Sequence, residues 1–107
     1  MIDLVSIERS TKKPYKYKAL FSTSSNARKI VTHFGHRAFE DYIIHKDRER
    51  RDRYRSRHRK DLDTDDPTRA GYLSYYILWN KPTLEASIRD YARRLRVYNK
   101  TGVFPID

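Results

Sequence analysis

The sequence predicts an α+β fold, in which a small N-terminal three-stranded antiparallel β-meander precedes two or three α-helices. In the first third of the chain, β-branched and aromatic residues form short runs with a period of two, which is typical of strands. After Gly35 the hydrophobic period lengthens, and the last third carries apolar residues on one helical face. The length of 107 residues fits a single domain, with the meander in residues 1–35 and a helical part in residues 36–107.

Three segments have the composition of strands. Residues 3–9 contain the run LVSIER, and in residues 15–21 apolar side chains such as Tyr17 and Phe21 alternate with mostly basic ones. Residues 28–34 are β-branched and stop at Gly35. Residues 10–14 have the composition and length of a hairpin turn, and residues 22–26 form a polar loop. Consecutive strands joined by short connections favour a meander.

The segment after Gly35 predicts two further elements. Residues 36–45 fit either a short helix or a turn followed by a last strand. Asp47 is then the expected N-cap of a helix from about residue 48 to residue 59. The only apolar residue of that helix is Tyr54, so it does not have the composition of an ordinary core helix.

The last part of the chain predicts a loop and two helices. After a loop at 61–67, Asp66 and Pro67 fit the N-cap and first position of a helix over about 68–79, which residues 80–82 break. Thr83 caps a last helix over 84–98, which Asn99 and Gly102 end. Its apolar residues follow one another at steps of 4, 3, 4 and 3 and therefore form one face: Leu84, Ile88, Tyr91, Leu95 and Tyr98.

Composition and spacing argue against several classes of function. The chain has no cysteine, which excludes disulfides and thiolate catalysis, and it has no Gly-rich phosphate loop. The pair His33 and His36 straddles a strand end and lacks a second ligand pair, although Glu40 or Asp41 lies nearby. We therefore expect no enzyme activity, catalytic residue, metal, cofactor or small-molecule substrate, and no membrane span.

The basic charge is concentrated in one segment. The formal net charge is +10, and residues 46–60 contribute +6 of it through nine Lys and Arg against three acids. An acidic cluster follows directly: Asp61, Asp63, Asp65 and Asp66. The two blocks could neutralise each other within the fold, and such pairing would weaken any inference of a polyanionic partner.

The arginine-rich segment 46–60 is the main candidate site, with three interpretations left open. It could lie along a nucleic-acid backbone, because the guanidinium fork matches phosphate. It could bind acidic patches of a protein partner, since Arg is enriched at interfaces. It could instead be a solvated helix with ion pairs such as Glu49–Arg53. The candidate binding residues are Lys46, Arg48, Arg51, Arg53, Tyr54, Arg55, Arg57, His58 and Arg59.

Aromatic residues crowd the predicted helix over 68–79. Most of them are expected to build the core of so small a domain. On a helical wheel, Tyr72 and Tyr75 point away from the side that carries Leu73, Tyr76 and Ile77. We therefore predict that Tyr72, Tyr75 and Trp79 are exposed anchors for a partner.

The order of these features resembles a known family. The spaced residues are Phe34-Gly35, Asp41-Tyr42, His45, Asp47, Tyr54, Arg57-His58, Ala70-Gly71, Leu78-Trp79 and Lys81. This pattern, over about residues 3–98, is similar to that of small basic proteins of uncharacterised function from large nucleocytoplasmic DNA viruses. The resemblance implies a location in the virion capsid, with host cytoplasm or viral factory during assembly, and other capsid or virion proteins as partners.

Two functions follow as hypotheses. The first is a non-enzymatic minor capsid protein that bridges larger shell proteins through surfaces rich in Arg and Tyr. The alternative is a sequence-nonspecific protein that binds double-stranded DNA through residues 46–60. The first ranks narrowly higher, because the acidic cluster is expected to offset the basic block. For the second, replacing Arg51, Arg55 and Arg59 with Gln is predicted to flatten the salt dependence of binding.

Overall fold

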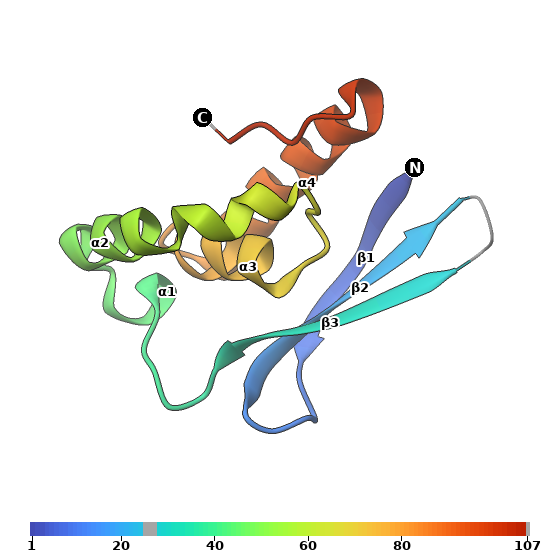
Figure 1. Cartoon of the computed structure of the whole chain (residues 1–107). Coiled ribbons are helices and arrows are strands. Elements are labelled where there is room, and N and C mark those ends of the chain that lie inside the picture. The colour runs from blue at the N-terminus through green and yellow to red at the C-terminus, as the bar shows by residue number, and fades with distance from the viewer. Residues whose placement is uncertain (25–27, 107) are drawn as a thin grey trace.

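The computed structural model describes residues 1–24 and 28–106 and confirms the predicted α+β architecture (Figure 1). A three-stranded antiparallel sheet with the order β1-β2-β3 is followed by the helices. The elements are β1 (Ile2–Arg9), β2 (Tyr15–Thr23), β3 (Lys29–His36), α1 (Tyr42–His45), α2 (Arg48–His58), the 3₁₀ turn η1 (Arg59–Thr64), α3 (Ala70–Leu73), the π-turn η2 (Ser74–Leu78) and α4 (Leu84–Thr101). Part of the predicted loop at 22–26 lies outside the described residues.

The helices cover one face of the sheet (Figure 1). The helix-covered face carries Ala19, Phe21 and Phe34, which are completely buried. Val5 and Val31 do not belong to this buried set, and they are 56% and 52% exposed. The helical side of the core comes mainly from α3, η2 and α4, and it includes Tyr76, Ile77, Leu78, Tyr91 and Leu95. The core therefore lies between a sheet with one packed face and a helical layer, the arrangement that alternating strands require.

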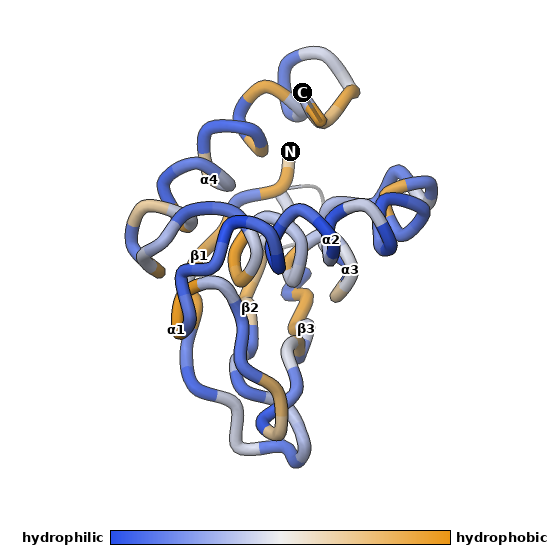
Figure 2. The backbone as a smooth tube through the Cα atoms, turned by 90° about the vertical axis from the view of Figure 1, so that its left-hand side faces the viewer, coloured by the Kyte–Doolittle hydropathy of each residue, from blue (hydrophilic) through white to orange (hydrophobic). Residues whose placement is uncertain are grey.

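The segment between the sheet and α2 is a turn followed by one turn of helix, so the alternative of a fourth strand is wrong. Asp41 begins α1 by accepting a hydrogen bond from the Ile43 amide at 3.1 Å. Asp47 begins α2 as predicted, because its carboxylate accepts from the amides of Glu49 and Arg50 at 3.0 and 3.3 Å. Figure 2 shows hydrophobic residues in α1 and a largely hydrophilic α2.

Two boundaries around residue 68 differ from the prediction. The predicted loop at 61–67 begins inside a 3₁₀ turn, and the next helix begins at Ala70. The Asp66 carboxylate accepts from the amide and hydroxyl of Thr68, which makes a local turn and no helix cap. From Ser74 the helix widens into a π-turn, in which the Trp79 amide donates to the Ser74 carbonyl at 3.1 Å.

The last helix is longer than predicted. Thr83 caps it as expected, but it runs to Thr101 and ends at Gly102, which has a φ of 79°. Asn99 does not end the helix. Its side-chain amide joins the edge strand β1, accepting from the Ile2 amide at 2.9 Å and donating to the Ile2 carbonyl at 2.8 Å. Within the described residues, no helix has the length and apolar character needed to cross a lipid bilayer.

Gly35 lies close to Leu78 of η2, and replacing it with alanine should destabilise the fold. Its φ is +76°, and a Cβ there would lie 2.8 Å from the Leu78 Cδ1 atom. We expect Gly35→Ala to lower the free energy of unfolding by about 2–4 kcal/mol, combining left-handed strain with overpacking. Gly102→Ala is the matched control, since its φ is +79° and its Cβ would meet no atom within 4 Å.

Chemical denaturation of the two alanine variants separates these contributions. The control should lose only the backbone strain of about 1–2 kcal/mol. Equal losses in the two variants would contradict the close approach of Leu78 to Gly35.

Candidate functional site

The arginine-rich helix α2 lies on the helical layer and has no buried residue. One stripe along it is nevertheless half-buried, consisting of Arg51, Tyr54, Arg55 and His58. These residues have the spacing i, i+3, i+4, i+7, which is the usual core-facing stripe of a helix, here built from arginine and aromatic side chains. The helix therefore docks onto the protein without burying aliphatic residues.

A column of stacked rings holds α2 in place. Tyr54 stacks on Trp79 with ring centroids 4.2 Å apart and an angle of 6°, and on His58 at 4.1 Å and 23°. On the side of Trp79, the His45 ring lies against the end of the column, with centroids 5.3 Å apart and a tilt of 55°. Three of the four rings come from α1 and α2, and Trp79 follows the π-turn. The column thus joins α2 to the end of η2.

Two arginines of α2 turn inward. The guanidinium of Arg51 lies 5.1 Å from the centre of the Tyr42 ring and donates to the Asn80 carbonyl at 3.3 Å. The guanidinium of Arg55 lies 4.4 Å from the centre of the Tyr75 ring. These cation–π contacts stabilise the docking of α2. Arg51 and Arg55 are therefore poor choices for testing phosphate contacts, since replacing them would also disturb packing.

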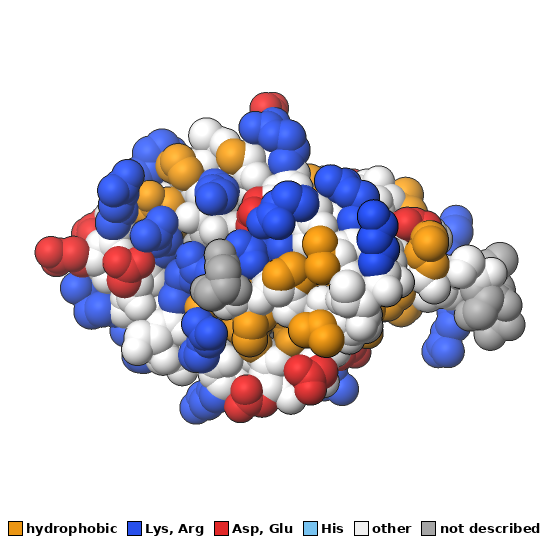
Figure 3. Space-filling view, turned by 90° about the horizontal axis from the view of Figure 1, so that it is seen from above, with side chains coloured by type: hydrophobic (Ala, Val, Ile, Leu, Met, Phe, Trp, Pro, Cys, Tyr) orange, Lys and Arg blue, Asp and Glu red, His pale blue; other side chains and the backbone are white. Residues whose placement is uncertain are grey.

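The remaining basic side chains of the segment 46–60 are exposed, and we call them the outer arginine face: Lys46, Arg48, Arg50, Arg53, Arg57, Arg59 and Lys60. Of this set, Arg53 forms the predicted ion pair with Glu49 at 3.8 Å, with the Glu49 and Arg53 side chains 88% and 60% exposed. An exposed pair of this kind contributes little. Figure 3, which looks onto the helical side, shows Lys and Arg side chains over much of that surface.

Among the described residues, the arginines of α2 form no ion pair with the acidic cluster. Asp61 faces His58 at 3.0 Å, and Asp66 faces Arg69 at 3.6 Å. Over residues 48–66, all of which the structure describes, no ion pair joins an arginine of α2 to the cluster. The excess of positive charge on the outer arginine face is therefore available to a partner.

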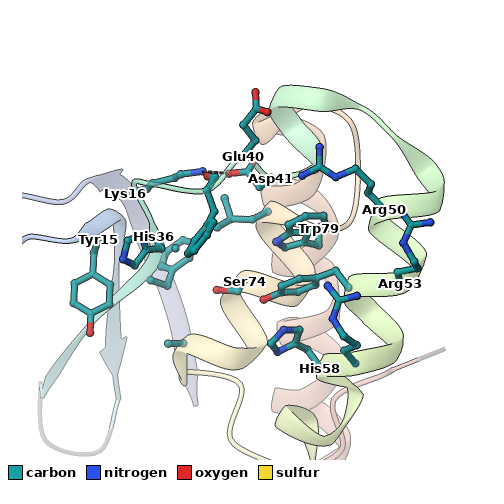
Figure 4. Close-up of a pocket in the computed structure, with 17 residues that line it drawn as sticks. Tyr15, Lys16, His36, Glu40, Asp41, Arg50, Arg53, His58, Ser74 and Trp79 are labelled. Atoms are coloured by element: carbon teal, nitrogen blue, oxygen red, sulfur yellow. Dashed lines mark hydrogen bonds and ion pairs between the residues drawn. The ribbon is translucent and has the colours of Figure 1, made fainter.

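A cavity of about 700 Å³ opens between α2 and the end of the sheet. In Figure 4, Tyr15, Lys16 and His36 come from the strand side, whereas Arg50, Arg53, His58, Ser74 and Trp79 come from the helical side. Lys16 is paired with Asp41 at 2.7 Å, and their side chains are only 15% and 6% exposed. The other lining residues include Phe34, Gly35, Phe39, Glu40, Tyr54, Arg57, Ala70 and Leu78.

Burial changes the acidity of two groups near the column. Burial and the nearby Asp61 carboxylate raise the pKa of Tyr54 to about 12, against an opposing hydrogen bond with Ser74. Burial, followed by the charge of Arg50, lowers the pKa of His45. Its Nδ1 accepts from the Asp47 amide at 2.9 Å. Both pKa shifts favour the uncharged form of the ring, which suits packing against other rings.

The prediction that Tyr72 and Tyr75 are exposed anchors for a partner is wrong. Tyr72 and Tyr75 are only 2% and 3% exposed. Tyr72 lies under η1 and the C-terminal tail, where its hydroxyl donates to the Leu62 carbonyl at 2.6 Å. The π-turn adds a residue to one helical turn and so changes the direction of Tyr75 relative to a regular helical wheel. Trp79 is half-buried and lines the cavity.

The structure also places the histidines outside any metal cluster. Among the described residues, no group of three or more His, Cys, Asp or Glu side chains could hold a metal ion. The Nδ1 of His33 lies 2.8 Å from the Ser10 hydroxyl, and the Nδ1 of His36 accepts from the Ala38 amide at 3.1 Å. His36 instead contributes to the cavity wall.

Sequence reasoning missed the strand side of the cavity. Tyr15, Lys16 and Phe39 carry no motif and lie far from α2 along the chain. The signal that could have found them is weak: Gly35 marks a close approach between the sheet and another element.

These features define a class: a small basic α+β protein with an exposed cationic helix beside an open, aromatic-lined cavity. Residues 5–58, half of the chain, match a family of unknown function, DUF5754, and the chain belongs to this family. The matched part runs from β1 to the end of α2 and contains the outer arginine face up to Arg57. Neither the curated proteins nor the solved structures contain a match to the chain.

Proposed function

We propose that the protein binds double-stranded DNA without sequence preference, through phosphate contacts made by the outer arginine face. The observation that carries this proposal is that, in the part of the chain that the structure describes, no arginine of α2 forms an ion pair with the acidic cluster, which pairs with α2 only through His58–Asp61. A capsid role ranks higher only if the acidic cluster pairs with the arginines of α2, and over the described residues 48–66 these arginines form no ion pair with it. Arginines that face solvent along one helix suit a phosphate backbone, and such contacts position a protein without reading bases.

A minor capsid protein that bridges shell proteins is the second candidate. Ile44 and Phe39 are 55% and 68% exposed, and Phe39 lines the same cavity as Arg53 and Arg57. Exposed apolar and arginine side chains together are also typical of protein interfaces. A virion location belongs to this candidate and is tested by the presence of the chain in purified particles.

The salt dependence of duplex binding tests the DNA proposal. We expect affinity for a labelled blunt duplex to fall steeply between about 50 and 200 mM salt, because each neutralised phosphate releases counterions. Replacing Arg48, Arg53 and Arg57 with Gln should reduce the slope of log affinity against log salt by about 2–3, at about 0.9 per contact.

The matched control removes the same charge from another helix. Arg89, Arg96 and Lys100 of α4 are exposed, and replacing all three with Gln changes the net charge equally. The control should retain the slope of the unmodified protein. Equal slopes in the two triple variants would show that net charge, and not α2, determines binding, and would overturn the proposal.

A further inference from the structure

The cavity beside α2 has two chemically different walls. The helical wall carries the guanidinium groups of Arg50, Arg53 and Arg57. The strand wall carries Tyr15, His36 and Phe39, with the rings of His36 and Phe39 centred 5.0 Å apart. Phe39 is 68% exposed, so its ring is accessible to a ligand from solvent.

The charge inside the cavity is positive. Lys16 and Asp41 pair with each other, so they leave little net charge. Figure 4 shows the Glu40 carboxylate pointing away from the space between the two walls. Neither Arg50 nor Arg57 makes an ion pair with any residue that the structure describes, and Arg53 meets only the exposed Glu49. The guanidinium groups thus remain available to an anion.

The Tyr54 ring in the stacked column has no face on which a ligand could stack. Tyr54 is covered on both sides, by Trp79 and by His58. Phe39, which is 68% exposed, offers aromatic surface to a flat ligand on the wall opposite the arginines.

We propose that the cavity binds a nucleoside phosphate, with the base against Phe39 and the phosphate toward Arg50 and Arg57. A volume of about 700 Å³ lies within the range of small-ligand pockets. The base supplies the planar surface that Phe39 stacks on, and the phosphate supplies the charge that the guanidinium groups match. The inference rests on the proposed function, because Arg50 and Arg57 also belong to the outer arginine face. It departs from the expectation that the protein has no small-molecule ligand.

The first test is calorimetric titration of the whole chain with deoxyadenosine monophosphate. Phe39→Ala should weaken its binding about tenfold, the loss expected from one base–aromatic contact. Ile44→Ala is the matched control, since Ile44 is a comparably exposed apolar residue that does not line the cavity. Inorganic phosphate should bind at least tenfold more weakly than the nucleotide. Equal binding of phosphate and nucleotide, or equal effects of the two variants, would overturn the inference.

The second test distinguishes the source of the nucleotide. If the cavity takes an unpaired nucleotide of a DNA strand, a duplex with a short single-stranded overhang should bind more tightly than a blunt duplex, and deoxyadenosine monophosphate should compete for the difference. If it takes a free nucleotide, the two duplexes should bind equally while the nucleotide still binds.

Failure of this inference is separable from failure of the proposed function. Steep, arginine-dependent binding of the blunt duplex without nucleotide binding would overturn the cavity site and leave the proposed function standing. Nucleotide binding without duplex binding would overturn the proposed function and leave the cavity as a site for a free nucleotide.

Discussion

Replacing Asp90 with alanine is expected to lower the free energy of unfolding by about 3–5 kcal/mol, because it removes the carboxylate that faces a buried arginine. The Arg94 side chain is 4% exposed, and its Nε lies 2.8 Å from Asp90. Asp90 also accepts from Asn80 at 2.7 Å and from Arg93 at 3.0 Å. The carboxylate thus joins α4 to the segment after η2. Small domains are stable by only about 5–15 kcal/mol, so this loss is large.

Urea denaturation at neutral pH measures the effect. The control is Asp63→Ala, because Asp63 is exposed and its removal should change stability by less than about 0.5 kcal/mol. A loss below about 1 kcal/mol for Asp90→Ala would mean that the carboxylate does not compensate the buried guanidinium.

The same carboxylate makes stability depend on pH. Burial alone would raise the pKa of Asp90, but hydrogen bonds from Arg94, Arg93 and Asn80 lower it to about 2, from 3.8. A carboxyl group whose pKa is lowered by folding stabilises the protein above the unfolded value and loses that contribution as the pH falls through the folded value. The contribution of about 2 kcal/mol should therefore disappear between about pH 4 and pH 2. The stability difference between the protein and Asp90→Ala should narrow over that window.

Replacing Trp79 with alanine is the second change with a large expected effect. Tyr54 is the aromatic residue through which α2 docks onto the protein. Its ring stacks on the Trp79 ring, with the two centroids 4.2 Å apart. Loss of a fully buried large aromatic side chain costs about 3–5 kcal/mol, and because Trp79 is half-buried we expect a loss toward the lower end of this range. Because α2 has no buried residue of its own, we expect the loss to appear as local opening of residues 48–58. Duplex binding should weaken as well, since the outer arginine face would no longer be ordered.

Hydrogen exchange resolved along the chain tests this prediction. The amides of α2 should lose protection in Trp79→Ala while those of α4 keep most of theirs. Tyr54→Phe is the control, because it preserves the stacked ring and removes only the hydroxyl. Uniform loss of protection across both helices would contradict local opening and would indicate a role for Trp79 in the common core.

The sequence carries enough information for the sheet and most helix boundaries, since these depend on local periodicity and caps. Asp47 and Thr83 cap the helices that they were predicted to cap. Asp66 was misassigned because an aspartate before proline has the same local signature in a turn as at a helix start. The π-turn has no such signature, and it changes the direction of Tyr75 relative to a regular helix.

The sequence predicts the charge of the candidate site but not which of its arginines face outward. Its charge is visible in the composition of residues 46–60, but the division into inward and outward arginines depends on rings from other segments, Tyr42 and Tyr75. Pairing between the basic and acidic blocks also depends on three-dimensional geometry: Asp61 pairs with His58 at the end of α2, and Asp66 pairs with Arg69 beyond η1. The cavity joins Tyr15 to Trp79 across most of the fold, a distance at which single-sequence patterns carry no information.

The contact between Asn99 and Ile2 has a consequence for self-association. β1 is an edge strand, and edge strands are templates for pairing with other chains. The Asn99 amide occupies one donor and one acceptor of that edge, in the way that a neighbouring strand would. The register shift between Leu4 and Ser6 interrupts the edge a few residues further on. Together they shorten the stretch open to intermolecular strand addition, so α4 protects the sheet from aggregation as well as covering its core.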